Sequence, residues 1–390
     1  MKDKKQNKRI NGGHRLLFFC ILCLFGLYVA VSYAEEQPQR EQSKTKVILL
    51  HTDNLTYDQY RHPGAQILTG NVQFQHDGVL MYCDSACFYE ATNSFDAFGH
   101  VKMVQGDTLD LVGDMLLYNG LDQLARVRHN VVLTHRESKL YTDSLDYDRL
   151  YELGYFFEGG KLVDKDNVLT SDWGQYSPPT RQAVFNYNVK LENPKFTLIS
   201  DTLNYNTLTS MAEIVGPSNI DSGDNHIYSE SGFYNTQTEE AILLDRSIVT
   251  NKGRKMVGDS LYYDSKSGVG EGFRNVVYTD EVNKNMLTGN YCYYNDSTGY
   301  SMATDSAVAI DYSQRDTMYM HADTFKVYTF YMDTDSMYRE VRGYHKVRSY
   351  RMDVQSVCDS LVFDSRDTCI TMYRDPIVWN GGQQVLGEVI

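Results

Sequence analysis

Histidine, cysteine and acidic residues are the side chains of this sequence that could do chemistry. The chain has 10 histidines and 7 cysteines among 390 residues, but they form no His-Glu-x-x-His or similar metal-ligand pattern. The sequence also lacks a Gly-x-Ser-x-Gly elbow, a Walker loop and a dinucleotide fingerprint. Paired carboxylates are common in a chain with 51 acidic residues, so they indicate nothing by themselves. We therefore expect no enzymatic activity, no cofactor and no metal site.

The five cysteines that follow residue 34 do not form a disulfide framework. They are Cys83, Cys87, Cys292, Cys358 and Cys369, and an odd number cannot all pair within one chain. Cys83 and Cys87 lie four residues apart on an expected strand, which separates their Cα atoms by about 13 Å, beyond disulfide reach. We interpret the cysteines as small buried residues, and the pair considered for a local bridge is Cys358 with Cys369.

The acidic residues recur in the pattern Asp-x-Leu-x-Tyr. The clearest copies occupy residues 53–57, 114–118, 143–147, 201–205 and 259–263, and weaker copies occupy 84–88, 172–176, 230–234, 290–294, 323–327 and 359–363. Successive copies are 31, 30, 29, 29, 29, 29, 29, 31, 33 and 36 residues apart. This spacing predicts a repeat protein with a unit of about 29 residues. The recurrent Asp could bind calcium, but without a Gly-Gly-x-Gly-x-Asp repeat it more often bonds backbone amides in a turn.

A second element follows, and its Val stands about 17 to 19 residues after the Asp of the copy. It occupies residues 70–74, 99–103, 129–133, 187–191 and 274–278, as in Gly70-Asn-Val-Gln-Phe74. In both elements large apolar residues alternate with polar ones, which is the period of a strand with one buried face. Polar turn segments such as 264–268 and 295–299 separate the elements. The sequence predicts an all-β, solenoid-like stack of antiparallel-type strands, without a substantial helix after residue 34.

The inward face of these strands is the candidate functional site. The inward positions are Leu55, Tyr57, Val72, Phe74, Leu116, Tyr118, Val131, Leu133, Leu145, Tyr147, Tyr176, Val189, Leu191, Leu203, Tyr205, Tyr234, Leu261, Tyr263 and Val276. They could line an interior that faces lipid, or they could fill an ordinary packed core. Gly174 and Gly232 stand at inward positions and would leave local space, which favours a cavity.

The first 34 residues form an export signal. A basic stretch precedes the apolar run 16–31, and Ser32-Tyr33-Ala34 provides small residues for a cleavage site. An uncleaved anchor in the inner membrane is the alternative, because the run is nearly long enough to span a bilayer. Residues 35–51 are expected to be a polar linker, and residues 52–390 the repeat region.

Charge excludes some partners. Residues 1–34 carry a net charge of +5 and the whole chain −14, so the remainder carries −19. Nucleic acid is a poor partner, because phosphate binding needs a basic surface. An anionic lipid would have to be held mainly by its acyl chains.

The end of the sequence lies inside a further unit. Glu388 stands 29 residues after Asp359, at the position of the recurrent Asp. Either the chain is a truncated form, or it ends in a strand with an unpaired edge. An exposed edge can pair with another chain, which would allow head-to-tail assembly.

These residues carry a resemblance to a known family. The alternation of Gly258-Asp-Ser-Leu-Tyr-Tyr263 with Leu68-Thr-Gly-Asn-Val-Gln-Phe74 resembles OstA-like lipopolysaccharide-transport proteins of the LptA type, from about Thr52 onward. The resemblance implies an elongated, twisted β-jelly roll, open at both ends, that shields lipopolysaccharide acyl chains in the periplasm and assembles end to end. It also implies a membrane-anchored partner and an outer-membrane partner. The inward positions above would face the lipid, and no catalytic residue is implied.

Two departures and two alternatives remain. The chain is longer than a simple bridge component of that family, so it could contain two stacked modules, about 52–200 and 201–390. An outer-membrane member would need a barrel after the repeats.

A β-helical polysaccharide lyase or hydrolase would show acidic and basic residues along one exposed sheet. An adhesin or structural solenoid would have interior side chains large enough to leave no groove.

Overall fold

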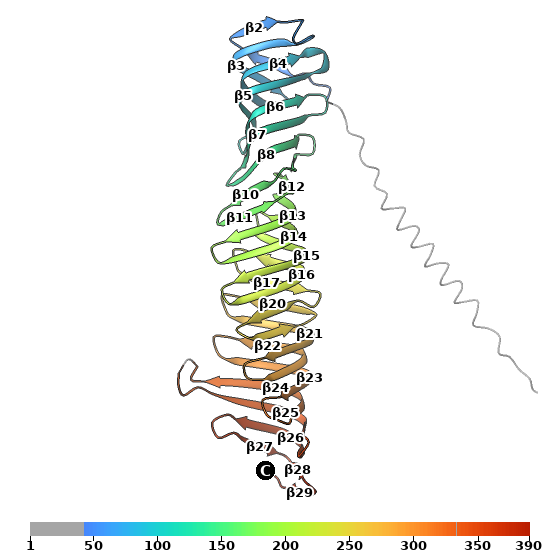
Figure 1. Cartoon of the computed structure of the whole chain (residues 1–390), viewed down its shortest axis with the longest axis vertical. Helices are drawn as coiled ribbons and strands as arrows, with labels where there is room; N and C mark the ends of the chain where they lie inside the picture. Colours follow the sequence, from blue (N-terminus) through green and yellow to red (C-terminus); the bar gives the residue numbers. More distant parts are fainter. Residues whose placement is uncertain (1–42, 333) are drawn as a thin grey trace, which may run out of the picture. The chain divides into compact units, whose positions relative to one another are not determined.

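The computed structural model describes residues 43–332 and 334–390. The expected export signal, residues 1–34, and residues 35–42 of the expected linker therefore lie outside the described residues. Residues 45–390 form one compact unit, in which strands follow one another along a single long axis (Figure 1). No helix in the described ranges has the length and apolar character needed to cross a bilayer.

Twenty-nine strands and one short 3-10 helix, η1 (Glu90–Thr92), make up this unit. The strands are β1 (Ile48–His51), β2 (Asn54–Tyr57), β3 (Gln66–His76), β4 (Val79–Tyr89), β5 (Ser94–Gln105), β6 (Leu109–Asn119), β7 (Leu124–His135), β8 (Ser138–Asp148), β9 (Leu153–Phe156), β10 (Gly160–Asp164), β11 (Asn167–Ser171), β12 (Trp173–Ser177), β13 (Gln182–Asn193), β14 (Phe196–Asn206), β15 (Met211–Ser222), β16 (Asn225–Asn235), β17 (Glu240–Leu244), β18 (Ile248–Asn251), β19 (Arg254–Val257), β20 (Ser260–Asp264), β21 (Val269–Asp280), β22 (Asn285–Asn295), β23 (Tyr300–Asp311), β24 (Met318–Phe330), β25 (Tyr338–Tyr350), β26 (Val354–Asp364), β27 (Cys369–Tyr373), β28 (Ile377–Asn380) and β29 (Gln383–Leu386).

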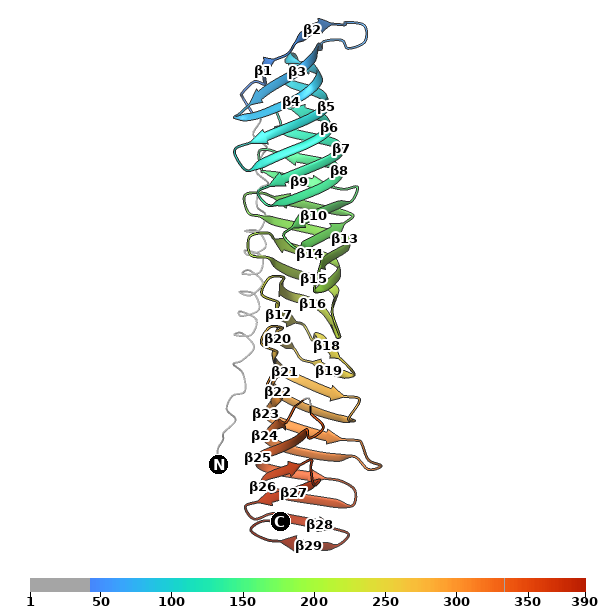
Figure 2. The ribbon, with the colours of Figure 1, turned by 90° about the vertical axis from the view of Figure 1, so that its left-hand side faces the viewer.

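The strands form an antiparallel stack in which consecutive long strands pair with each other. Some levels of the stack consist of two short strands in place of one long one; β9 and β10, for example, both pair with β8. Figure 2 shows the levels ascending from β29 to β2. The all-β stack of antiparallel strands expected from the 29-residue period is confirmed, and it agrees with the elongated β-jelly roll that the resemblance implies.

Each long strand bends near its middle, where its pairing shifts register. In β7 the shift lies between Arg128 and Val131, and the two residues between them, His129 and Asn130, have positive φ angles of 62° and 52°. Asparagine adopts this left-handed conformation more readily than most residues. The bend folds each strand over, so that its two halves enclose an interior.

The recurrent Asp fixes the bend. Asp114 of β6 accepts a hydrogen bond from the Asn130 amide at 2.6 Å, and Asp172 accepts one from Asn188 at 2.6 Å. Asp53 with Asn71 and Asp259 with Asn275 repeat the contact at 3.0 and 2.8 Å. The Asp therefore bonds a side-chain amide of the neighbouring strand, which explains why Asp-x-Leu-x-Tyr alternates with an Asn-Val element.

Glycine is required where the recurrent Asp comes close to the backbone of the neighbouring strand. Gly99 has a φ of +74°, and a Cβ atom there would lie 2.4 Å from the Asp84 carboxylate. The Asp84 carboxylate instead bonds His100, the residue after the glycine, at 2.7 Å.

The stack begins earlier than the sequence predicts. Residues 48–51, expected within the linker, form β1, which pairs with residues 73–75 of β3, while β2 pairs with residues 66–69. Val47 is buried. The edge of β3 is long enough to hold both short strands, so residues 48–57 together form the first level.

All five described cysteines are free, so the bridge considered between Cys358 and Cys369 is not formed. Cys358 is buried in β26, whereas Cys369 is exposed at the start of β27. The interpretation as small buried residues holds for Cys83, Cys292 and Cys358 only.

We predict that Asp114→Ala lowers the free energy of unfolding by about 1 kcal/mol, because the bend loses its hydrogen bond to Asn130. Asp201→Ala is the matched control, because Pro217 occupies the place of the asparagine there and cannot donate. Urea unfolding of both variants measures the difference. Equal losses in the two variants would contradict a role for the Asp–Asn contact.

Candidate functional site: the interior of the stack

Most of the predicted inward residues do point into the interior. Sixteen are buried: Val72, Phe74, Leu116, Tyr118, Val131, Leu133, Leu145, Tyr147, Tyr176, Val189, Leu191, Leu203, Tyr205, Tyr234, Leu261 and Val276. Tyr263 is partly buried and packs against them. Leu55 and Tyr57 are exposed, which corrects the prediction for the first unit. Their strand, β2, pairs on one side only, with β3.

The interior is filled from β3 to β20. Aromatic rings take up much of the space: Phe74 stacks on Phe95 with ring centroids 4.1 Å apart, and Phe95 contacts Tyr118 at 5.2 Å. Phe74, Phe95 and Tyr118 are at most 2% exposed. Buried residues from Val47 to Leu261 form one continuous cluster. This half, which we call the N-terminal half, is a packed core.

The glycines taken as signs of a cavity do not leave one. A Cβ atom on Gly174 would lie 2.4 Å from the ring of Phe156, and one on Gly232 would lie 2.5 Å from the carbonyl oxygen of Ile242. A neighbouring ring and a neighbouring strand therefore already occupy the space. The inference from these two positions was wrong.

The interior from β21 to β27, which we call the C-terminal half, is built differently. Its buried residues form a second, smaller cluster that begins at Val276. Small side chains predominate at the base of the bend: Gly272, Cys292, Ala303, Ala307, Ala322 and Gly343. Phe325 and Leu361 are buried within this cluster, whereas the inward side chains of Leu287, Met320, Val341 and Met372 pack against it but are only partly buried. Apolar surface of the interior is thus accessible to solvent in this half.

A line of polar contacts closes the N-terminal half. Because every strand bends, the turns form two rows, one containing Asp77 and Gly78 and the other containing residues 120–123. Gln123 donates a hydrogen bond to the Asp77 carboxylate at 2.8 Å, so the two rows meet. We call the line where they meet the seam. Across it, Gln105 donates to Glu152 at 2.6 Å, and Lys165 donates to Ser210 at 3.2 Å.

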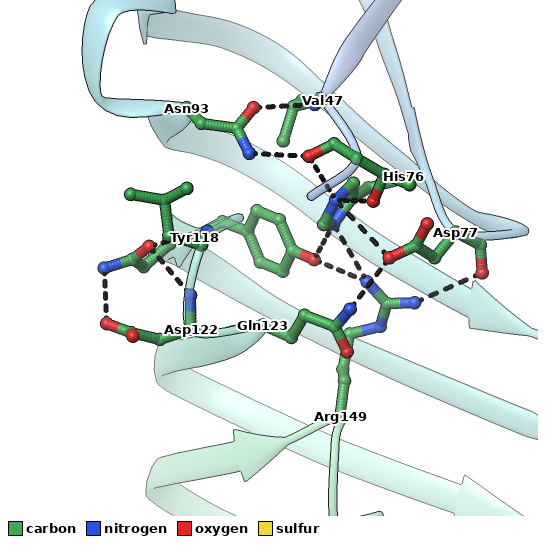
Figure 3. Close-up of polar contacts among 11 residues, drawn as sticks. Val47, His76, Asp77, Asn93, Tyr118, Asp122, Gln123 and Arg149 are labelled. Atoms are coloured by element: carbon green, nitrogen blue, oxygen red, sulfur yellow. Dashed lines mark hydrogen bonds and ion pairs between the residues drawn. The ribbon is translucent and has the colours of Figure 1, made fainter. Parts of the chain in front are cut away.

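The most connected group at the seam surrounds His76 (Figure 3). His76 Nδ1 lies 2.7 Å from the Tyr118 hydroxyl, and its Nε2 lies 2.9 Å from Thr45 Oγ1. The Arg149 guanidinium donates to the Tyr118 hydroxyl and approaches His76 Nδ1 at 3.3 Å. A neutral imidazole that accepts at Nδ1 and donates from Nε2 satisfies all these contacts. Burial, the largest cause, and Arg149 both lower the pKa of His76, although Asp77 opposes them.

Thr45 and Val47 cover this group from the start of the described chain. The Val47 amide donates to the Asn93 side chain at 2.7 Å, and Asn93 in turn donates to the Thr45 carbonyl oxygen at 3.0 Å. The first residues of the stack are therefore tied to both rows of turns.

The same arrangement recurs further along the seam. His135 lies 2.8 Å from the Tyr176 hydroxyl, and the Tyr205 hydroxyl donates to Asp164 at 2.8 Å. Lys195 pairs with Glu239. Among the described residues after Glu239, no hydrogen bond or ion pair joins the two rows of turns. The seam bridges therefore accompany the filled half of the interior and are absent from the half with small side chains.

Sequence reasoning missed the polar residues of the seam, although a signal for them exists. His76, His135 and Asp164 precede their tyrosine partners by 42, 41 and 41 residues. Each of these tyrosines ends a copy of Asp-x-Leu-x-Tyr, and a buried tyrosine hydroxyl needs a partner. The corresponding position before Tyr147 holds Gln105 and Gly106, and the Tyr147 hydroxyl is buried without a partner.

Metal binding finds no support in the described ranges, where no three His, Cys, Asp or Glu residues lie close enough to hold an ion.

Comparison with known proteins identifies the family to which this chain belongs. The model of the OstA-like protein family matches residues 44–201 and 197–259, which together span more than half of the chain. No curated protein matches the sequence. One similar solved structure is LptH of Pseudomonas aeruginosa, described as the LptA homologous periplasmic component of a lipopolysaccharide transport device. It is 19% identical, with 31% of this chain and 82% of LptH covered and a TM-score of 0.26.

We predict that acid destabilises the fold through its seam histidines. Burial holds the pKa of His76 and of His135 below the ordinary value of 6.5. As the pH falls below about 6.5, the unfolded chain takes up protons that the folded chain does not, so the free energy of unfolding falls. Between about pH 7 and about pH 5, the double variant His76→Gln/His135→Gln should lose on the order of 1 kcal/mol less than the native chain.

The control for this prediction is His100→Gln. His100 is exposed, and its hydrogen bond to Asp84 raises its pKa, so removing it should not weaken the loss of stability in acid. Urea unfolding at each pH gives the free energies, and an unchanged pH dependence in the double variant would contradict the prediction.

Proposed function

Because this chain belongs to the OstA-like protein family, we propose that it is a periplasmic lipopolysaccharide-transport protein that shields acyl chains in its interior. The observation that carries the proposal is the partly exposed apolar interior of the C-terminal half, around Leu287, Met320 and Val341. Burial of acyl chains against such surface is favourable in proportion to the apolar area removed from water. No catalytic group is needed for this task.

The chemistry of the ligand follows from the charge of the chain. The part after residue 34 carries a net charge of −19, so long-range electrostatics oppose an anionic headgroup. The acyl chains therefore provide the binding energy, and the phosphates of the headgroup stay in solvent. Export by residues 1–34 and passage of lipid between the inner and outer membranes complete the proposal.

The partners would dock on strand edges. β2 pairs with β3 on one side only, and its exposed Leu55 and Tyr57 would suit an added strand from another chain. A membrane-anchored partner, an outer-membrane partner or a second copy could supply that strand. The module division proposed from the sequence, near residue 200, would move to the break between the two interior clusters, after Leu261.

A second function has one observation in its favour. The filled interior of the N-terminal half is what a structural or adhesive solenoid would have along its whole length. The two functions differ in whether lipid reaches the C-terminal half.

We predict that a photoreactive amino acid at Met320 crosslinks to purified lipopolysaccharide, whereas the same probe at Tyr319 does not. The two residues are neighbours on β24, but Met320 packs in the interior and Tyr319 is 46% exposed on the outside. Mass spectrometry of the adducts measures the yields. Equal crosslinking at both positions would favour nonspecific contact and a structural role.

We also predict that Ala309→Trp weakens lipopolysaccharide binding about tenfold, because a large side chain would occupy the interior that acyl chains need. Ala309 faces the interior between Leu287 and Met320. Val308→Trp, on the opposite face of the same strand, is the control and should bind normally. Binding is measured by titration with fluorescent lipopolysaccharide, and intact binding by the Ala309 variant would count against the proposed site.

A further inference from the structure

The seam raises a question that the proposed function leaves open, namely how an acyl chain could move along an interior that is filled from β3 to β20. We propose that the seam bridges are a reversible closure: they hold the N-terminal half shut when no lipid passes, while the C-terminal half stays open and admits lipid. This inference rests on the proposed function for its purpose, but the closure can be tested without lipid.

Tyr118 links the closure to the core. Its hydroxyl is held at the seam by His76 and Arg149, and its ring contacts Phe95, which stacks on Phe74. Parting the two rows of turns would therefore withdraw the Tyr118 ring and uncover the aromatic residues beneath it. The other seam tyrosines are Tyr176 and Tyr205. In each, the hydroxyl is hydrogen-bonded at the seam and the ring is buried in the core.

The seam bridges are of a kind that can exchange with water. Each joins side chains of facing turns or of the strand ends next to them, and water can replace these bonds when the rows part, so a single bridge contributes little net stability. The backbone pairing along the stack does not cross the seam, so opening would break no strand pairing. Opening and closing therefore change side-chain contacts only, while the backbone stays folded.

The closed state also carries unsatisfied polar groups. Gln105 Oε1, Ser144 Oγ, Tyr147 OH and Arg149 Nε are buried without a hydrogen-bond partner in the described chain. All four lie in the N-terminal half, and Arg149 is itself part of the seam. Buried polar atoms of this kind are costly, and opening would let water reach them. The seam bridges thus stabilise the closed state and the unsatisfied groups destabilise it, as expected for a closure that opens.

Three native cysteines report on opening in the two halves. Cys83 lies in the filled half, whereas Cys292 and Cys358 lie in the half without bridges; their exposures are 6, 5 and 8%. Burial raises the pKa of Cys83 and Cys292 to about 12 and that of Cys358 to about 11. Cys83 and Cys292 match in both exposure and pKa, so the comparison of their labelling rates by a maleimide reports access.

The experiment measures maleimide labelling of each cysteine in the full chain by peptide mass spectrometry. In the native protein, Cys83 should label at least about fivefold more slowly than Cys292. Tyr118→Phe/Arg149→Met should speed Cys83 labelling severalfold and leave Cys292 and Cys358 unchanged. Tyr141→Phe, an exposed tyrosine away from the seam, is the control and should change nothing.

The outcomes separate the alternatives. Equal labelling of Cys83 and Cys292 in the native protein, or a Cys83 rate that the double variant leaves unchanged, would overturn the proposed closure. If the double variant unfolds, all its cysteines will label fast, and the milder Arg149→Met variant then decides in the same way. If Cys83 behaves as expected but added lipopolysaccharide does not protect Cys292, the closure stands and the proposed lipid function fails.

Discussion

The bend in the middle of every long strand is the constraint on which the rest of the structure depends. A flat stack of antiparallel strands would expose both faces, whereas a stack bent at every level encloses one of them. The bend needs residues with positive φ, such as Asn130, and it needs a bond to hold neighbouring bends in line. The Asp–Asn hydrogen bond supplies that alignment from one strand to the next, so each repeat of the sequence corresponds to two neighbouring bends.

Side-chain size then decides what the enclosed face becomes. In the N-terminal half, Phe95 and Tyr118 reach across the interior and touch their neighbours, and tyrosine hydroxyls extend to the seam. In the C-terminal half, Ala303 and Ala322 stand in the interior, and the larger Leu287, Met320 and Val341 are only partly buried. The presence of seam bridges follows from the same difference, because a tyrosine long enough to fill the interior is also long enough to place its hydroxyl among the turns.

The sequence predicted the features that repeat and missed those that do not. The period, the alternation of Leu and Tyr, and the turn segments all recur, so the fold class and sixteen inward residues could be deduced. The prediction for Leu55 was wrong because a side chain faces the interior only where its strand pairs on both sides, and β2 pairs on one side only. Gly174 failed because the ring of Phe156, 18 residues away, fills its space. The polar contacts of the seam were not predicted because their partners lie about 41 residues apart. At that separation one partner belongs to one repeat and the other to the second repeat after it.

The two halves share one backbone plan, which has a consequence for how such a chain can be tuned. The bends and strand pairings of β21 to β26 match those of β3 to β8, although one interior is filled and the other keeps partly exposed apolar side chains. Openness is therefore a property of a few inward side chains and can change without any change of fold. The same kind of repeat can accordingly form a filled segment and a segment with an accessible interior within one stack. Under the proposed function, the C-terminal half would receive an apolar ligand and the N-terminal half would control its further movement.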